Sequence, residues 1–205
     1  MLLESGKSVD VDLVILSIGV RPESQLAKDA SLTLNPRGYI AVNDYMQTND
    51  PDVYAVGDVI ETQDLVFPDR KATVALGNIA NMQARIAADH IVLGKSIPYK
   101  GSLGTSIVRA FDTVLALTGW NEKRLKAAGI PYATTTITEN SHAGYYPNAL
   151  PITLKITFDP ATGRVFGGQA GACVLPCVAT FPVDIWFDLF SFIFEQWVLM
   201  ASISA

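Results

Sequence analysis

The chain is poor in cysteine and holds no cluster of metal-binding residue types. Its two cysteines, Cys173 and Cys177, are separated by three residues. A structural zinc site needs four ligands, and a thioredoxin-like redox pair needs the spacing C-x-x-C. The sequence therefore predicts neither, and we expect no bound metal.

Basic charge and long apolar runs are also scarce. The 15 Lys and Arg residues are outnumbered by 20 Asp and Glu, giving a formal net charge of -5. Nucleic-acid-binding domains cluster basic side chains on one face, so we expect no nucleic acid partner. Residues 1–7 lack the apolar run of a signal peptide, and a cytoplasmic location follows by default. With 49% hydrophobic residues the chain can still bury a core.

The C-terminal residues 173–205 contain no Lys, Arg or His. They are rich in aliphatic and aromatic residues, but Asp184, Asp188 and Glu195 interrupt the pattern. The longest uncharged piece is shorter than the roughly 20 residues of a bilayer-spanning helix, so we expect no transmembrane span. Two interpretations remain open: a substituted C-terminus, for example from a shifted reading frame, or a buried helix at a subunit interface.

A Gly-Asp pair ends the segment Thr48 to Asp58. The apolar run Val53 to Val56 predicts a short strand, after which Gly57 lets the backbone turn and approach a phosphate. Asp58 then lies at the carboxyl end of the strand, where open α/β sheets bind ligands. Its carboxylate can accept hydrogen bonds from sugar-type hydroxyls. The alternative is an ordinary turn after a strand.

A helix is predicted from Thr73 to about Val92, after a polar loop over residues 61–70. Thr73 is the expected N-cap and Gly94 the expected C-terminal stop. The helix N-terminus carries partial positive charge. A plain amphipathic surface helix is the alternative. The apolar stripe that predicts the helix consists of Ala72, Leu76, Ile79, Met82, Ile86 and Ala87.

The remaining segments predict mostly strands. Residues 9–20 have the continuous apolar character of a strand buried on both faces, followed by a short helix or turn over 23–30, a turn at 35–38 and a strand at 39–42. A boundary falls at 94–101. Beyond it we predict strands at 105–111, 113–119, 132–137, 152–158 and 164–168, a helix at 121–128, and a turn at 159–163. Strands with one inserted helix make an α+β domain.

The order of these segments resembles the FAD-dependent pyridine nucleotide-disulfide oxidoreductases. The resemblance implies an α/β plus α+β fold: a partial FAD/NAD(P)-binding Rossmann-like domain followed by an α+β dimerisation domain. The implied domains are 1–20 (end of the NAD(P)-binding domain), 21–100 (C-terminal part of the FAD-binding domain) and 101–171 (dimerisation domain), with 172–205 as an atypical tail. The implied cofactor-binding residues are Gly57, Asp58 and Val59 at the ribityl chain and pyrophosphate, and Thr73, Val74 and Ala75 at the flavin ring.

The segment Ser141 to Pro147 resembles coenzyme A-disulfide reductases and their persulfide-reducing relatives. In them a tyrosine of this segment reaches the partner subunit's active site, which makes Tyr145 and Tyr146 the candidate catalytic residues. A phenol can protonate a leaving thiolate. The alternative is that both are packing aromatics, and the choice between the two tyrosines stays open.

The family's two G-x-G-x-x-G loops and its redox cysteine are absent from these residues. We therefore expect an incomplete fragment of an enzyme that uses FAD and NAD(P)H to reduce coenzyme A disulfide or a related disulfide or persulfide. Its partners would be a second copy or a complementing N-terminal half. The alternatives are an NADH oxidase or peroxidase of the same family, or a non-catalytic dimerisation fragment.

Overall fold

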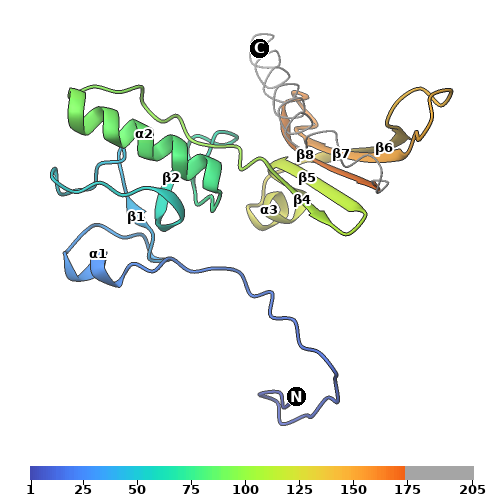
Figure 1. Cartoon of the computed structure of the whole chain (residues 1–205), viewed down its shortest axis with the longest axis horizontal. Coiled ribbons are helices and arrows are strands. Elements are labelled where there is room, and N and C mark those ends of the chain that lie inside the picture. The colour runs from blue at the N-terminus through green and yellow to red at the C-terminus, as the bar shows by residue number, and fades with distance from the viewer. Residues whose placement is uncertain (174–205) are drawn as a thin grey trace.

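The computed structural model describes residues 1–173, which form two lobes (Figure 1). An extended N-terminal segment leads into the first lobe, and the second lobe follows it along the chain. The first lobe contains α1 (Gln25–Asp29), β1 (Ile40–Ala41), the 3-10 helix η1 (Gly57–Val59), β2 (Ile60–Gln63), β3 (Lys71–Ala72) and α2 (Gly77–Leu93). The second contains β4 (Ser106–Ala110), β5 (Thr113–Gly119), α3 (Glu122–Ala127), β6 (Ala133–Asn140), β7 (Pro151–Phe158) and β8 (Val165–Cys173).

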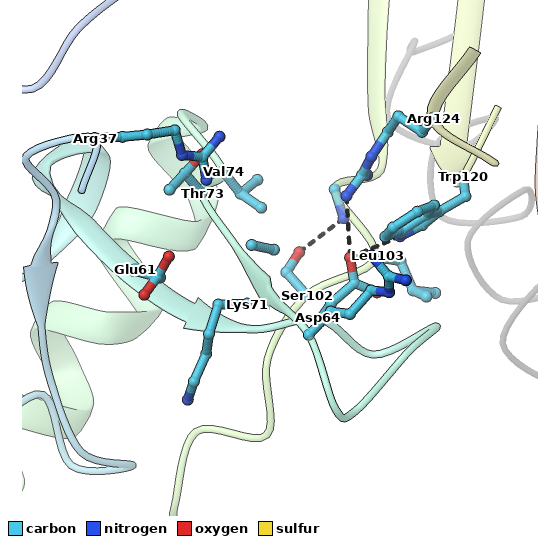
Figure 2. Close-up of a pocket in the computed structure, with 13 residues that line it drawn as sticks. Arg37, Glu61, Asp64, Lys71, Thr73, Val74, Ser102, Leu103, Trp120 and Arg124 are labelled. Carbon is cyan, nitrogen blue, oxygen red and sulfur yellow. Dashed lines mark hydrogen bonds and ion pairs between the residues drawn. The ribbon is translucent and has the colours of Figure 1, made fainter. Parts of the chain in front are cut away.

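A buried carboxylate joins the two lobes. Asp64 directly follows β2, and its Oδ2 accepts hydrogen bonds from Trp120 Nε1 at 2.7 Å and Arg124 Nη2 at 3.1 Å in the second lobe (Figure 2). Its Oδ1 accepts the N–H groups of Val66 and Phe67. The segment 61–70 is therefore not the plain polar loop expected from the sequence: it begins as a strand and then forms an interlobe contact.

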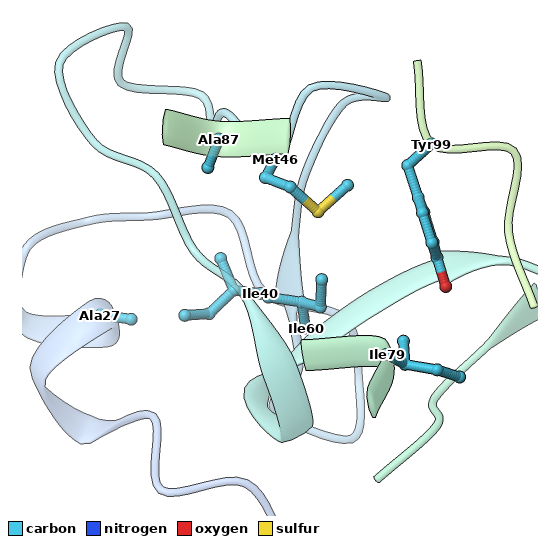
Figure 3. Close-up of a cluster of buried hydrophobic side chains, with 7 residues drawn as sticks. All are labelled: Ala27, Ile40, Met46, Ile60, Ile79, Ala87 and Tyr99. Carbon is cyan, nitrogen blue, oxygen red and sulfur yellow. The ribbon is translucent and has the colours of Figure 1, made fainter. Parts of the chain in front are cut away.

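The first lobe packs α2 against a small three-stranded sheet. The strand order is β1-β2-β3, with β1 parallel to β2 and β2 antiparallel to β3. Met46 is the most buried core side chain at 1% exposure. The buried cluster consists of Ala27, Ile40, Met46, Ile60, Ile79, Ala87 and Tyr99 (Figure 3).

The predicted helix exists but starts later than expected. Its N-cap is Leu76, with extended backbone angles and no side-chain cap, so the prediction of Thr73 as N-cap is wrong. Residues 73–76 instead have no regular structure between β3 and α2, and the Leu76 N–H bonds the Val74 carbonyl. The stop at Gly94 is confirmed: Gly94 has φ +66° and its N–H bonds the His90 carbonyl. Met82, expected on the buried stripe, is 46% exposed.

Two predicted strands do not form. Residues 9–20 run without regular strand structure, and apolar side chains such as Ile18 are exposed. Of residues 53–56 only Tyr54 forms an isolated bridge, to Gln47. A strand needs a neighbour for its backbone hydrogen bonds, and the described residues supply none for residues 10–20. Residues 53–55 make only a short pairing with residues 46–48, in which the Ala55 N–H bonds the Met46 carbonyl and the Thr48 N–H bonds the Val53 carbonyl.

The second lobe confirms the predicted α+β arrangement. Its five strands are antiparallel in the order β4-β5-β8-β7-β6. Asn121 caps α3 through a hydrogen bond from the Arg124 N–H. β8 runs to Cys173, beyond the expected end at Gly168, because it pairs with both β5 and β7. A second core centres on Trp120, Leu125 and Phe166.

The expectations for residues 174–205, including Cys177 and the two interpretations of the tail, lie outside the described residues. Within residues 1–173, no helix has the length and apolar character required to span a membrane.

Candidate functional site

The Gly57–Asp58 pair forms the first turn of η1, against the side of α2. Gly57 has φ +81°, a conformation that glycine adopts without steric cost. Its N–H donates to Gln83 Oε1 of α2 at 2.8 Å, and its carbonyl accepts the Ile60 N–H. A Cβ on Gly57 would lie 3.4 Å from the Ala80 Cβ. The turn therefore packs closely on α2.

Asp58 is exposed, and no residue within 1–173 forms a hydrogen bond or ion pair with its carboxylate. A carboxylate held on a fixed turn with free acceptor oxygens suits a ligand that carries hydroxyl groups.

The N-terminus of α2 lacks a side-chain cap. The first intrahelical bond runs from the Ala80 N–H to the Leu76 carbonyl, so the amides of residues 77–79 precede the hydrogen-bonded ladder. Uncapped amides and the helix dipole favour partial negative charge at this end. Both features fit the flavin: Asp58 suits the ribityl hydroxyls, and the α2 N-terminus suits the electron-rich edge of the ring.

Thr73 and Val74 line a pocket of about 620 Å³ between the lobes, whereas Ala75 is exposed and outside it (Figure 2). Gly57, Asp58 and Val59 do not line this pocket. The predicted cofactor residues thus divide into the η1 turn and the pocket wall. The pocket is lined by Arg37, Glu61, Asp64, Arg70, Lys71, Ala72, Thr73, Val74, Ser102, Leu103, Gly104, Trp120 and Arg124.

Tyr145 and Tyr146 lie in the loop between β6 and β7. Their side chains are 84% and 60% exposed, and their ring centroids are 4.9 Å apart. His142 bonds to Ser141 Oγ and to the Pro147 carbonyl within the same loop. Figure 1 places this loop at the opposite end of the molecule from α2. One copy of the chain therefore does not bring these tyrosines to the Gly57–Asp58 turn.

Sequence reasoning missed the polar residues that fix the site. Gln83 holds the turn, and Asp64 joins the pocket walls. A signal for Gln83 was present, since it falls between Ile79 and Ala87 at spacings of four on a buried stripe. Among residues 1–173, no group of three or more His, Cys, Asp or Glu side chains is arranged to hold a metal ion.

Comparisons with known proteins identify the family. Residues 1–90 match the family model described as pyridine nucleotide-disulphide oxidoreductase. This chain belongs to that family, whose members are oxidoreductases that use flavin.

Three relatives show the extent of the similarity. A coenzyme A disulfide reductase of Staphylococcus epidermidis is 39% identical over 166 residues, covering 81% of this chain and 37% of the relative. The crystal structure of reduced Bacillus anthracis CoADR-RHD matches with TM-score 0.81 and 42% identity, covering 95% of this chain and 34% of that chain. An NAD-dependent persulfide reductase from A. fulgidus matches with TM-score 0.81 and 32% identity over the same shares, 95% and 34%. The chain thus spans little more than a third of the length of these relatives.

Proposed function

We propose that this chain supplies part of the flavin site and the α+β domain of an oxidoreductase that uses NAD(P)H and FAD to reduce coenzyme A disulfide or a related disulfide or persulfide. One observation carries the proposal: the left-handed Gly57 turn, fixed on α2, leaves Asp58 exposed and unpaired within the described residues. The names of the S. epidermidis and A. fulgidus relatives support the substrate class.

The role of the chain's own residues is to hold and orient the cofactor. Asp58 would accept hydrogen bonds from the ribityl hydroxyls, and the Val59 amide would meet the pyrophosphate, because the Gly57 N–H is already bonded to Gln83 Oε1. The amides at the start of α2 would face the pyrimidine edge of the flavin, with Thr73, Val74 and Ala75 beside it. Bound FAD would carry reducing equivalents from the nicotinamide to the disulfide.

The phenols of the β6–β7 loop act on a second copy of the chain. Tyr145 and Tyr146 are too far from α2 to serve their own turn, but their exposure leaves them free to enter a partner's site. There a phenol protonates the leaving thiolate of the disulfide. This assignment requires a homodimer.

The five-stranded sheet offers a surface for that dimer. Val108 and Leu115 are cross-strand neighbours on β4 and β5, and they are 60% and 52% exposed. Adjacent exposed apolar side chains are typical of partner surfaces. Leu115→Lys should shift the chain toward the monomer in light scattering, and an unchanged molar mass would argue against this interface.

A chimaera tests the function directly. The matching 166 residues of this chain replace their counterparts in the S. epidermidis coenzyme A disulfide reductase, which restores a chain of full length. We expect the purified chimaera to contain FAD and to oxidise NAD(P)H when coenzyme A disulfide is added. Oxidation with dioxygen alone, and none with the disulfide, would instead indicate an oxidase.

Variants of the two tyrosines separate their roles in the same chimaera. Tyr145→Phe or Tyr146→Phe should lower kcat with coenzyme A disulfide by about 100-fold or more, the usual range for loss of a general acid. The FAD content should not change. Tyr39→Phe is the matched control, because Tyr39 lies in the first lobe, outside the loop. Full activity of both single variants and of the double variant would contradict the catalytic assignment.

A further inference from the structure

Gln83 is a polar side chain buried in an apolar stripe. It lies between Ile79 and Ala87 on α2, and all three are buried, Gln83 with 2% exposure. A buried side-chain amide costs free energy unless hydrogen bonds replace those it made to water. An aliphatic residue would pack in this position without that cost, so we expect the amide to have a specific role.

The bond that Gln83 makes goes to the Gly57–Asp58 turn. Its Oε1 accepts the Gly57 N–H at 2.8 Å, across 26 residues of sequence. The assignment of the oxygen to this end follows from the chemistry, since an N–H donor requires an acceptor. The Gly57 carbonyl is held by the Ile60 N–H, so this residue is fixed at both its N–H and its carbonyl.

The other surroundings of the amide are also polar and buried. Tyr99 is 5% exposed, and its hydroxyl has no hydrogen-bond partner in the described chain. Burial raises the pKa of the Tyr99 phenol, and the side chains of Gln83, Ser102 and Thr62 oppose that rise. Gln83 therefore lies between the η1 turn and a buried phenol, inside the contact between α2 and the sheet.

We propose that Gln83 is a positioning residue that fixes the left-handed conformation of Gly57 and thereby aims Asp58 at the flavin. This proposal rests on the proposed function. Gln83 is buried and acts through its hydrogen bond to the Gly57 peptide. Without its acceptor oxygen the turn would remain attached to α2 by packing, but the Gly57 peptide would be free to rotate and Asp58 would lose its fixed direction.

Two substitutions separate this role from simple filling of the core. Gln83→Met keeps an unbranched side chain of similar length and removes the acceptor. Gln83→Glu keeps an acceptor oxygen at the same place. Ile79→Val is the control, because it trims a buried neighbour one turn away and leaves the bond to Gly57 intact.

The first measurement uses the full 205-residue chain without added cofactor. Amide hydrogen exchange should show protection at Gly57, reduced about tenfold in Gln83→Met, the upper range for one hydrogen bond. Gln83→Glu and Ile79→Val should retain the protection within about threefold. Equal Gly57 exchange in the wild type and Gln83→Met would overturn the proposal, whatever the function.

The second measurement uses the chimaera and follows FAD binding by quenching of flavin fluorescence. Gln83→Met should weaken FAD binding about tenfold, Gln83→Glu should restore most of it, and Ile79→Val should have no effect. If Asp58→Ala weakens FAD binding but Gln83→Met does not, the positioning role is wrong and the flavin site stands. If neither weakens it, the flavin assignment of the turn and this inference both fail.

Discussion

Replacement of Asp64 should loosen the contact between the two lobes. Its side chain is 3% exposed and accepts four hydrogen bonds, of which those from Trp120 and Arg124 cross the interface. Asp64→Asn preserves the shape, and its oxygen can still accept the N–H groups of Val66 and Phe67. The new NH₂ group then faces the Trp120 N–H, so two donors meet and the interlobe bonds are lost.

The magnitude follows from the burial of each partner. Trp120 is 5% exposed, and an unsatisfied buried donor costs about 1 to 3 kcal/mol. The Arg124 side chain is 46% exposed, so solvent screening limits its pair with Asp64 to about 1 kcal/mol or less. We therefore expect Asp64→Asn to lower the free energy of unfolding by about 1 to 4 kcal/mol.

Urea denaturation followed by circular dichroism measures this loss. Arg124→Gln is the matched comparison and should cost about 1 to 2 kcal/mol, because it removes the screened pair and the contact of the guanidinium with the Trp120 ring, whose centroid lies 4.1 Å from Cζ. Asp69→Asn, on an exposed neighbour in the same hairpin, is the control and should be neutral. A loss under about 0.5 kcal/mol for Asp64→Asn would refute the view that this carboxylate joins the lobes.

Two further predictions concern the second lobe. Gly167→Ala places a Cβ 2.6 Å from the Trp120 backbone nitrogen and should lower the free energy of unfolding by about 3 kcal/mol. Gly171→Ala, on the same strand, brings its Cβ only to 3.4 Å from the Leu115 side chain and should lower it far less. Equal urea midpoints for the two variants would contradict this prediction. The pKa of Asp159 is lowered from 3.8 by the Ala161 N–H and then by the Thr162 hydroxyl. The stabilisation that the Asp159 carboxylate gives the β7–β8 turn is thus complete above pH 3.8 and is lost as the pH falls through the lower pKa of the folded state. Protection of the Gly163 amide against hydrogen exchange should therefore fall in that pH range in the wild type and be independent of pH in Asp159→Asn.

The sequence predicted best the parts of the fold that depend on local chemistry. The second-lobe strands, the α3 helix and the turn at 159–163 formed where expected, although β6 and β8 run further than predicted, because alternation, Asn121 and Gly163 act within a few residues. The start of α2 was misplaced because Thr73 is chemically a good cap, yet the helix begins only at Gly77, after a segment without regular structure.

Contacts between residues far apart in the sequence could not be predicted from local sequence patterns. The bond from Trp120 to Asp64 spans 56 residues, and the bond from Gly57 to Gln83 spans 26. The periodicity of apolar residues indicates which side of a helix or strand is buried. It does not indicate which distant group a polar side chain contacts. The strands expected at 9–20 and 53–56 failed for a related reason, since an apolar run forms a strand only as far as a neighbouring segment pairs with it.

The affinity for FAD of the Asp58→Ala chimaera tests the central claim most directly. Loss of a charged hydrogen-bond acceptor costs about 1.5 to 3 kcal/mol, which corresponds to a rise in the FAD dissociation constant of about tenfold or more. Asp52→Ala, which removes an exposed carboxylate from the same segment, is the control and should leave the affinity unchanged. A wild-type dissociation constant in Asp58→Ala, or an equal rise in Asp52→Ala, would contradict the flavin site.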